Sequence, residues 1–231
     1  MTNAVFAKVG AIYRSPIGKK FITAITGLAL AVFVLVHMVG NLTLFISPTA
    51  YNEYAYHLET WGVLLYAIEG ILLVSVLFHA AVGIEIFASR LRARPQVYSD
   101  YRSAGQPSYQ SVSSRTMIIT GTLLAAFIVA HLLTFKFGPY YPTQIHGEQA
   151  RDLARLVVEK FQQPFFTVSY TALMGLLGLH LRHGIWSLFQ SLGLLGEGLR
   201  PLVFTAGSLL AAAIATGFIA LPWAIYFGVI G

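Results

Sequence analysis

Four histidines of this sequence lie inside long apolar segments, where their imidazole rings have few polar partners. They are His37, His79, His131 and His180. A neutral imidazole is a ligand for transition metals and for haem iron. A single histidine in lipid more often bridges two helices by a hydrogen bond or belongs to a polar pathway. Which chemistry applies depends on whether the four rings can meet in pairs.

The segments around these histidines repeat. Residues 25–37 and 119–131 each contain Ile-Thr-Gly, nine further residues and a histidine, with seven identities in thirteen positions. His79 and His180 are each followed by Gly-Ile, with the glycine four residues on. Because four residues are about one helical turn, each glycine removes side-chain bulk from the face that carries the histidine. The pattern indicates a duplicated helix pair, although two apolar helices also share residues by chance.

The composition places these segments in a membrane. Of the 231 residues, 56% are hydrophobic and 10% are charged, and the mean hydropathy is +0.69. So little polar surface cannot cover a water-soluble protein. The net charge of +6 is interpreted as a positive cytoplasmic side in contact with anionic lipid, rather than as nucleic-acid binding. The absence of cysteine excludes disulfides, iron–sulfur clusters and thiolate haem ligands, so metal chemistry would depend on histidine.

Five apolar stretches are each long enough to cross a bilayer, which takes about 20 residues. The sequence therefore predicts an all-α integral membrane protein with one transmembrane domain over residues 1–231. The first four spans are expected to form a bundle with an internal two-fold pseudo-repeat, and the fifth to pack against it. The predicted spans cover residues 21–46, 62–88, 117–135, 165–189 and 202–231.

Lysine and arginine are concentrated on one side of the predicted spans. Four of them precede the first span and five arginines lie between the second and third, whereas the loop over residues 47–61 has none. This asymmetry predicts a cytoplasmic N-terminus in the inner (cytoplasmic) membrane. In the third connection, residues 147–161 have an apolar side at helical spacing, which predicts a short interfacial helix or an ordinary solvated loop helix.

Counting 1.5 Å per residue from the start of each span gives the depth of each histidine. The count places His37 and His131, on outward-running helices, in the outer half of the bilayer. It places His79 and His180, on inward-running helices, in the inner half. The result is two pairs of imidazoles, one above the other, about 15–20 Å apart along the membrane normal.

Two imidazoles that face each other across an apolar slot are what bis-histidine haem b requires. A zinc or copper site would need further ligands near each pair, and none is evident in the sequence. We therefore expect two stacked haems b, with His37 and His131 on the outer iron and His79 and His180 on the inner iron. The small and aromatic residues expected to line the slots are Gly27, Gly40, Gly83, Gly121, Gly184, Phe33, Phe78 and Phe127.

Other polar residues in or near the spans each have two interpretations. Glu69 would be a proton or quinone group, or a hydrogen-bonded structural carboxyl. Arg182 would extend to the interface or, like Lys20 and Arg115, pair with a haem propionate. His183 is a second candidate for the ligand in the fourth span, but it has no partner in the repeat. Candidates for binding a quinone at the outer side are Asn41, Tyr51, Asn52, Glu53, Glu59 and Glu69.

In the order of its motifs, and over most of its length, the chain resembles the cytochrome b membrane-anchor subunit of succinate dehydrogenase and fumarate reductase (complex II), in its single-chain, five-helix, dihaem form. Three stretches carry the resemblance. They are IGKKFITAITGLALAVFVLVHMVGN at residues 17–41, VLFHAAVGIEIF at 76–87 followed by ARPQVY, and VVEKFQQPFFTVSYTALMGLLGLHLRHGIWSLFQSLGL at 157–194.

The resemblance implies the same haem ligands as the depth count. It also implies a flavoprotein and an iron–sulfur subunit on the cytoplasmic face, with the succinate/fumarate site on the flavoprotein. Electrons would pass through the haems to or from a quinone, with menaquinone favoured over ubiquinone, and a higher oligomer of the whole complex is left open. The basic residues at 19–20 and 90–94 would form part of the docking face, or attract anionic lipid.

The chain departs from the family pattern at one position. Some fumarate reductase anchors carry a glutamate two residues before the fourth-helix ligand, associated with proton transfer across the membrane. This sequence has Gly178 there, which puts such a pathway in doubt.

Two other functions compete with this one. The first is the cytochrome b anchor of another quinone-linked enzyme, such as a hydrogenase or formate dehydrogenase, against which the motif order speaks. The second is a proton-coupled secondary transporter that uses intramembrane histidines and Glu69. A transporter has no need for two histidine couples at matched depths, so the pairing of the histidines distinguishes a dihaem cytochrome from a transporter.

Overall fold

The computed structural model describes Tyr13, residues 15–93 and residues 112–230. Five helices in these residues are long and apolar enough to cross a membrane, as the sequence predicts. The chain is a helical, multi-pass membrane protein. The membrane helices are α2 (Pro16–Leu42, extended by η1, Thr43–Phe45), α4 (Val63–Ala93), α6 (Met117–His131, extended by η2, Leu132–Lys136), α8 (Pro164–Ser191) and α9 (Leu199–Tyr226).

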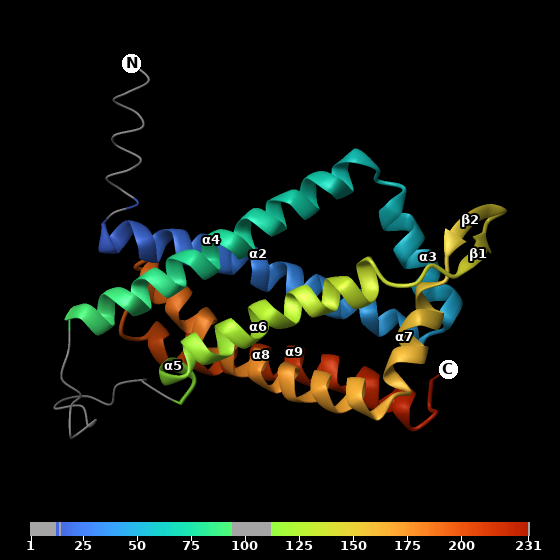
Figure 1. Cartoon of the computed structure of the whole chain (residues 1–231). Helices are drawn as coiled ribbons and strands as arrows, with labels where there is room; N and C mark the ends of the chain where they lie inside the picture. The colour runs from blue at the N-terminus through green and yellow to red at the C-terminus, as the bar shows by residue number, and fades with distance from the viewer. Residues whose placement is uncertain (1–12, 14, 94–111, 231) are drawn as a thin grey trace, which may run out of the picture.

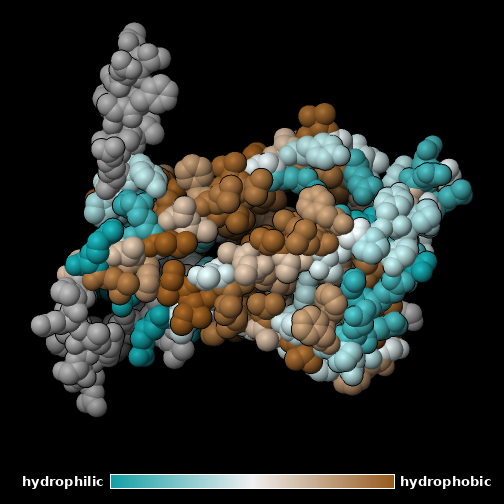
Figure 2. Space-filling model, in the orientation of Figure 1, coloured by the Kyte–Doolittle hydropathy of each residue, from teal (hydrophilic) through white to brown (hydrophobic). Residues whose placement is uncertain are grey.

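Figure 1 shows these helices lying lengthwise beside one another. Figure 2 shows brown apolar residues over the middle of the molecule and teal hydrophilic residues toward its two ends. We call the end with α5 (Val112–Arg115) and the start of α2 the basic end, because Lys20, Arg90 and Arg92 lie there. The opposite end carries a small folded cap, and we call it the cap end.

Local sequence signals fix where the helices begin. Ser15 precedes α2, and its Oγ accepts a hydrogen bond from the backbone N–H of Gly18 at 2.9 Å. Ser47 does the same for the N–H of Ala50 at 3.0 Å, at the start of α3 (Pro48–Glu59). A proline follows each serine, at the first position of the helix. The backbone N–H of this position has no hydrogen-bond partner within a helix, so proline loses nothing by lacking it, and its fixed φ suits the first turn.

The helices pack in neighbouring pairs. Helix α2 packs against α4, and α6 packs against α8. Helix α9 packs along α8 and also contacts α2, which agrees with the packing role expected for the fifth span. Ala211 and Ile214 of α9 and Leu181 of α8 are buried in the core between these helices.

The cap consists of α3, a two-stranded antiparallel hairpin and α7 (Leu153–Phe161). Its strands are β1 (Pro142–Ile145) and β2 (Glu148–Arg151). The prediction of one helix over residues 147–161 is therefore wrong in its first part. His146 and Gly147 both have positive φ, of 54° and 85°, which suits a tight two-residue hairpin turn. Asp152 then caps α7 by accepting the N–H of Arg155 at 3.0 Å.

The apolar side of α7 packs against protein. Val157 and Phe161 share a buried cluster with Tyr51 of α3 and with Leu221 and Ile225 of α9. The segment over residues 47–61, which the sequence predicts as a loop, contains helix α3, whose 12 residues make about three turns. The cap therefore closes one end of the bundle with a small core of its own.

Candidate haem sites

The rings of His79 on α4 and His180 on α8 meet, with their centroids 6.2 Å apart and their planes inclined at 65°. Each ring lies against a glycine of another helix. A Cβ on Gly27 of α2 would lie 3.0 Å from Cε1 of His79, and a Cβ on Gly121 of α6 would lie 3.3 Å from Cε1 of His180. These two glycines, which the sequence repeat matches to each other, therefore let α2 and α6 approach the rings.

A threonine beside each glycine contacts the same ring. Thr26 Oγ1 lies 3.3 Å from Nδ1 of His79, and Thr120 Oγ1 lies 3.1 Å from Nδ1 of His180. His79 Nδ1 also lies 3.2 Å from the backbone carbonyl of Thr23. In the sequence these two threonines are marked only by the Ile-Thr-Gly repeat, in which each directly precedes Gly27 or Gly121.

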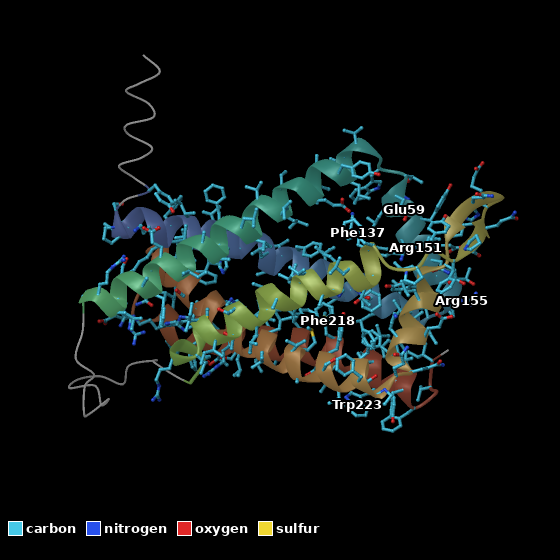
Figure 3. All side chains as sticks on the ribbon, in the orientation of Figure 1. Glu59, Phe137, Arg151, Arg155, Phe218 and Trp223 are labelled. Carbon is cyan, nitrogen blue, oxygen red and sulfur yellow. The ribbon has the colours of Figure 1, made fainter. Side chains whose placement is uncertain are left out.

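The second pair is formed by His37 on α2 and His131 on α6, with ring centroids 5.8 Å apart. Aromatic side chains surround it. Phe33 stacks on His37 with ring centroids 5.4 Å apart, and Phe218 of α9, which Figure 3 labels, lies 5.9 Å from the same ring. His131 Nδ1 lies 3.4 Å from the hydroxyl of Tyr170. Tyr170 and Phe218 were not foreseen, because nothing in their own helices marks them as neighbours of a histidine.

The two pairs lie at different levels of the bundle. Gly27 and Gly121 mark the level of the His79–His180 pair, and the histidines of the other pair follow ten residues later on the same helices. Ten helical residues span about 15 Å. The structure thus brings together the two couples that the depth count predicts, separated along the helices.

The donor set fits a porphyrin iron. Bonds of about 2 Å from one ion to both rings would hold the ring centroids about 6 Å apart, close to the two separations found here. Among the described residues, no group of three or more His, Asp or Glu converges as a metal cage would require. With only two imidazoles at each site, the remaining ligands of an iron ion would have to come from a porphyrin. An added Cβ at Gly83 or at Gly184 would meet nothing within 4 Å, so no neighbouring helix packs against these two glycines as α2 and α6 pack at the histidine rings.

Of the other residues expected to line the slots, Phe127 lies beside a histidine ring, whereas Gly40 and Phe78 do not. Phe127 lies beside His131, with centroids 5.5 Å apart. Gly40 is not at a ring of either pair but under Tyr54 of the cap, whose Cε1 would lie 2.5 Å from an added Cβ. Phe78 is 50% exposed on the surface of α4.

The predicted propionate partners are not gathered at one place. Arg182 lies against α9, where its Nε donates to Ser208 Oγ at 3.2 Å and its guanidinium covers the ring of Phe204. Lys20 is exposed at the basic end, and Arg115 is exposed in α5. His183 is partly buried and takes no part in the ring pair formed by His180.

Both glutamates of α4 form ion pairs with lysines from neighbouring segments. Glu85 binds Lys19 of α2 and accepts a hydrogen bond from the hydroxyl of Tyr13 at 3.1 Å. Glu69 binds Lys136 of η2, near the cap end, and both side chains of this pair are more than one third exposed. The structure therefore gives Glu69 a partner, and leaves the pair accessible from outside the bundle.

The polar residues proposed to bind a quinone have different surroundings. Asn41 donates to the carbonyl of His37 at 2.8 Å and accepts from the hydroxyl of Tyr51 at 3.2 Å. Burial raises the pKa of Tyr51 well above its ordinary value. Asn52 is buried and fully engaged within the cap. Glu53 and Glu59 are exposed on α3.

The cap is held together by hydrogen bonds between distant residues. Asn52 Nδ2 donates to Asp152 Oδ1 at 2.8 Å, and Asn52 Oδ1 accepts the N–H of Ala154 at 2.9 Å. Arg151, labelled in Figure 3, donates to the backbone carbonyls of Lys136 and Pro139. These bonds fasten the hairpin and α7 to α3 and to the end of η2.

An exposed network on the cap is sensitive to acid. The hydroxyl of Tyr141 donates to Glu159 at 2.6 Å, and Arg155 donates to it at 2.8 Å. These two bonds lower the pKa of Glu159 from its ordinary value of 4.5. Because the folded pKa is lowered, the stabilisation is present above 4.5 and is lost as the pH falls through the folded pKa.

Gly178, the position of the family departure, is at a close contact between α8 and α9. An added Cβ would lie 3.0 Å from Cβ of Ala215 and 3.7 Å from the carbonyl of Ala211. A glutamate would therefore have to displace α9. We expect Gly178→Leu to lower the free energy of unfolding by about 1–3 kcal/mol, the usual effect of overpacking.

Gly175, one turn earlier on α8, is the matched control, because an added Cβ there meets nothing within 4 Å. Gly175→Leu should leave stability close to that of the unmodified protein. Unfolding in mixed micelles with increasing dodecyl sulfate measures both. Equal stability of the two variants would show that α9 does not rest on Gly178 as described.

Part of the basic segments lies outside the described part of the chain. The residues concerned are Lys8 and Arg14 before the first span, Arg94 and Arg102 between the second and third, and most of the ARPQVY stretch, and Gly231 at the end of the fifth predicted span lies outside it as well.

Comparison of the chain with protein-family models, with curated proteins and with solved structures finds no match.

Proposed function

We propose that the chain is a dihaem cytochrome b that anchors a succinate:quinone oxidoreductase to the membrane and passes electrons between its iron–sulfur subunit and a quinone. The observation that carries the proposal is the meeting of four membrane histidines in two couples, with centroids 6.2 and 5.8 Å apart. A histidine that only joins two helices by a hydrogen bond would need one acceptor of any kind, and no second histidine. Two equivalent couples in one bundle are what two stacked haems require.

Bound haem would supply one-electron redox chemistry at each level. The protein's part is to hold the rings, exclude water and set the local charge. His79 and His180 would hold one haem, and His37 and His131 the other. The glycines at 27 and 121 admit the rings of the first pair, and Phe33, Phe127 and Phe218 surround the second with apolar surface.

The matched contacts of the two halves support the proposed two-fold pseudo-repeat. Thr26 and Gly27 of α2 contact His79, and Thr120 and Gly121 of α6 contact His180. Helices α2 and α4 would then correspond to α6 and α8. One haem at each level would lie between the two halves, near the pseudo-axis.

The basic end would face the cytoplasm and the soluble subunits. Lys20, Arg90 and Arg92 are exposed there, whereas Lys19 is engaged by Glu85. A positive face would attract an iron–sulfur subunit with an acidic surface, and it would follow the positive-inside rule. Lys20 is also a candidate partner for a haem propionate. The flavoprotein, with its dicarboxylate site, would bind beyond the iron–sulfur subunit.

The cap end would then face outward, near the His37–His131 haem. Among the candidate polar residues, Glu53 and Glu59 are exposed on α3 of the cap, whereas Glu69 lies on the membrane helix α4. Glu69 and its partner Lys136 have partly exposed side chains at the edge of the bundle. We propose this pair as the polar element of a quinone site, with menaquinone favoured over ubiquinone. Asn52 is engaged in the cap, so it serves the fold rather than the quinone.

Purification of the chain with its bound subunits tests the proposal. A dithionite-reduced minus oxidised spectrum should contain the sharp α-band of low-spin haem b, and the iron bound as haem should be two per chain. Electron transfer from succinate to a menaquinone analogue should depend on the chain. A colourless chain would leave the proton-coupled transporter as the better function, and copurification of a hydrogenase or formate dehydrogenase would select the other anchor.

A further inference from the structure

The hydrogen bonds at the His79–His180 pair determine which ring nitrogen carries the proton. The carbonyl oxygen of Thr23 can only accept, so His79 Nδ1, 3.2 Å away, must donate. The hydroxyl of Thr26 donates to the carbonyl of Ile22 at 2.7 Å, which leaves its oxygen to accept from the same Nδ1–H. With the proton on Nδ1, the lone pair of His79 is on Nε2.

The same arrangement holds at His180, with one difference. Thr120 is 1% exposed, and its hydroxyl faces the carbonyls of Thr116 and Met117, each at 3.2 Å. When the hydroxyl donates to one of these carbonyls, its oxygen is left to accept from His180 Nδ1–H, 3.1 Å away. Within the described part of the chain this is the one acceptor at His180 Nδ1, whereas His79 has two.

In the described residues, the rings of His37 and His131 have no comparable hydrogen bond to a group that can only accept. His131 Nδ1 lies 3.4 Å from the hydroxyl of Tyr170, which can donate or accept. The ring of His37 makes aromatic contacts and, within the described ranges, no hydrogen bond. The bundle thus holds one pair of rings by fixed acceptors and the other mainly by packing.

Resting on the proposed function, we propose that Thr26 and Thr120 are positioning residues of the haem held by His79 and His180. Each accepts a hydrogen bond from Nδ1–H of one axial histidine, which fixes the ring plane and presents Nε2 to the iron. Such a bond also makes the imidazole a stronger donor, which favours ferric iron and lowers the reduction potential of this haem.

The test is Thr120→Val in the full chain, purified with its subunits, because valine keeps the shape and removes the acceptor. The haem concerned is identified as the component that disappears in His180→Ala. Its ferric-to-ferrous equilibrium should shift about tenfold toward the ferrous form, which is an upward shift of about 59 mV for a one-electron couple. The electron paramagnetic resonance signal of its ferric form should change as well, because the ring is no longer held.

Three further variants sharpen the result. Thr26→Val should have the smaller effect, since the Thr23 carbonyl still accepts from His79. Thr120→Ser should restore both potential and signal. Thr171→Val is the matched control, because Thr171 makes the same kind of bond to the carbonyl four residues earlier, at 2.7 Å, and no bond to a histidine among the described residues.

The outcomes separate the two proposals. Unmodified protein without haem would defeat the proposed function itself. Unmodified protein with two haems, together with an unchanged potential and signal in Thr120→Val, would overturn only the role of the threonines. If Thr120→Val loses this haem entirely, retention in Thr120→Ser supports the role and loss in both variants contradicts it.

Discussion

Replacement of His180 by alanine is expected to remove one of the two proposed haems and to leave the other in place. His180 faces His79 with ring centroids 6.2 Å apart, whereas the rings of His37 and His131 meet each other about 15 Å further along the helices. Loss of one ring leaves a single axial ligand, too few for low-spin haem b. Haem iron should fall from about two to about one per chain, and one redox component should vanish from a potentiometric titration.

The pairing makes a sharper prediction. His79→Ala should remove the same component as His180→Ala, and the double variant should lose no more than either single one. Such non-additivity is expected of residues that act on one site. Replacement of His37 or His131 should remove the other component.

His183→Ala is the matched control for His180→Ala. It removes an imidazole from the same helix, three residues away and outside the ring pair. Both haems should stay. Depletion of a common component by His79→Ala and His131→Ala would mean that the rings pair differently from the structure described above.

Asn52→Leu is expected to destabilise the cap strongly. The side-chain amide of Asn52 is 8% exposed and uses both of its ends, one on the carboxylate of Asp152 and one on the N–H of Ala154. Leucine has nearly the same size but leaves these two groups without their partner. Loss of the partner of a buried group such as the N–H of Ala154 costs about 1–3 kcal/mol, and loss of a bond to the partly buried carboxylate of Asp152 costs about 1 kcal/mol, so the free energy of unfolding should fall by about 2–4 kcal/mol.

Unfolding in mixed micelles measures this loss, with two comparison variants. Asn52→Asp should also be destabilised, because it sets a second carboxylate against that of Asp152. Glu53→Gln, on the exposed neighbouring residue, should be close to neutral. A residue that served only to bind a quinone would behave differently: Asn52→Leu would slow quinone reduction and leave unfolding unchanged.

The sequence by itself determined the features that depend on length and residue type. Five apolar stretches predict five spans because a helix rises a fixed 1.5 Å per residue across a bilayer of fixed thickness. The same constant rise placed His37 with His131 and His79 with His180 before any tertiary contact was known. The absence of cysteine, which is also visible in the sequence alone, left histidine as the expected metal ligand.

The tertiary structure alone decided which side chains meet across helices. Thr26 contacts His79, Lys19 binds Glu85 and Arg182 lies against α9. These contacts depend on how far each helix is rotated about its axis. In a soluble helix an apolar stripe reveals that rotation, but in a membrane helix the lipid-facing side is as apolar as the packed side. The pattern of a single span therefore carries little information about its neighbours.

The cap illustrates the same limit outside the membrane. Its helix α7 was predicted from apolar spacing, but its start at Leu153 depends on the Asp152 cap and on the hairpin before it. Asn52 and Asp152 are 100 residues apart in the chain, so no local pattern joins them. Local spacing predicted the spans and α7 but not α3 or the hairpin. Contacts between distant residues determined where the elements end and which polar groups are left free for chemistry.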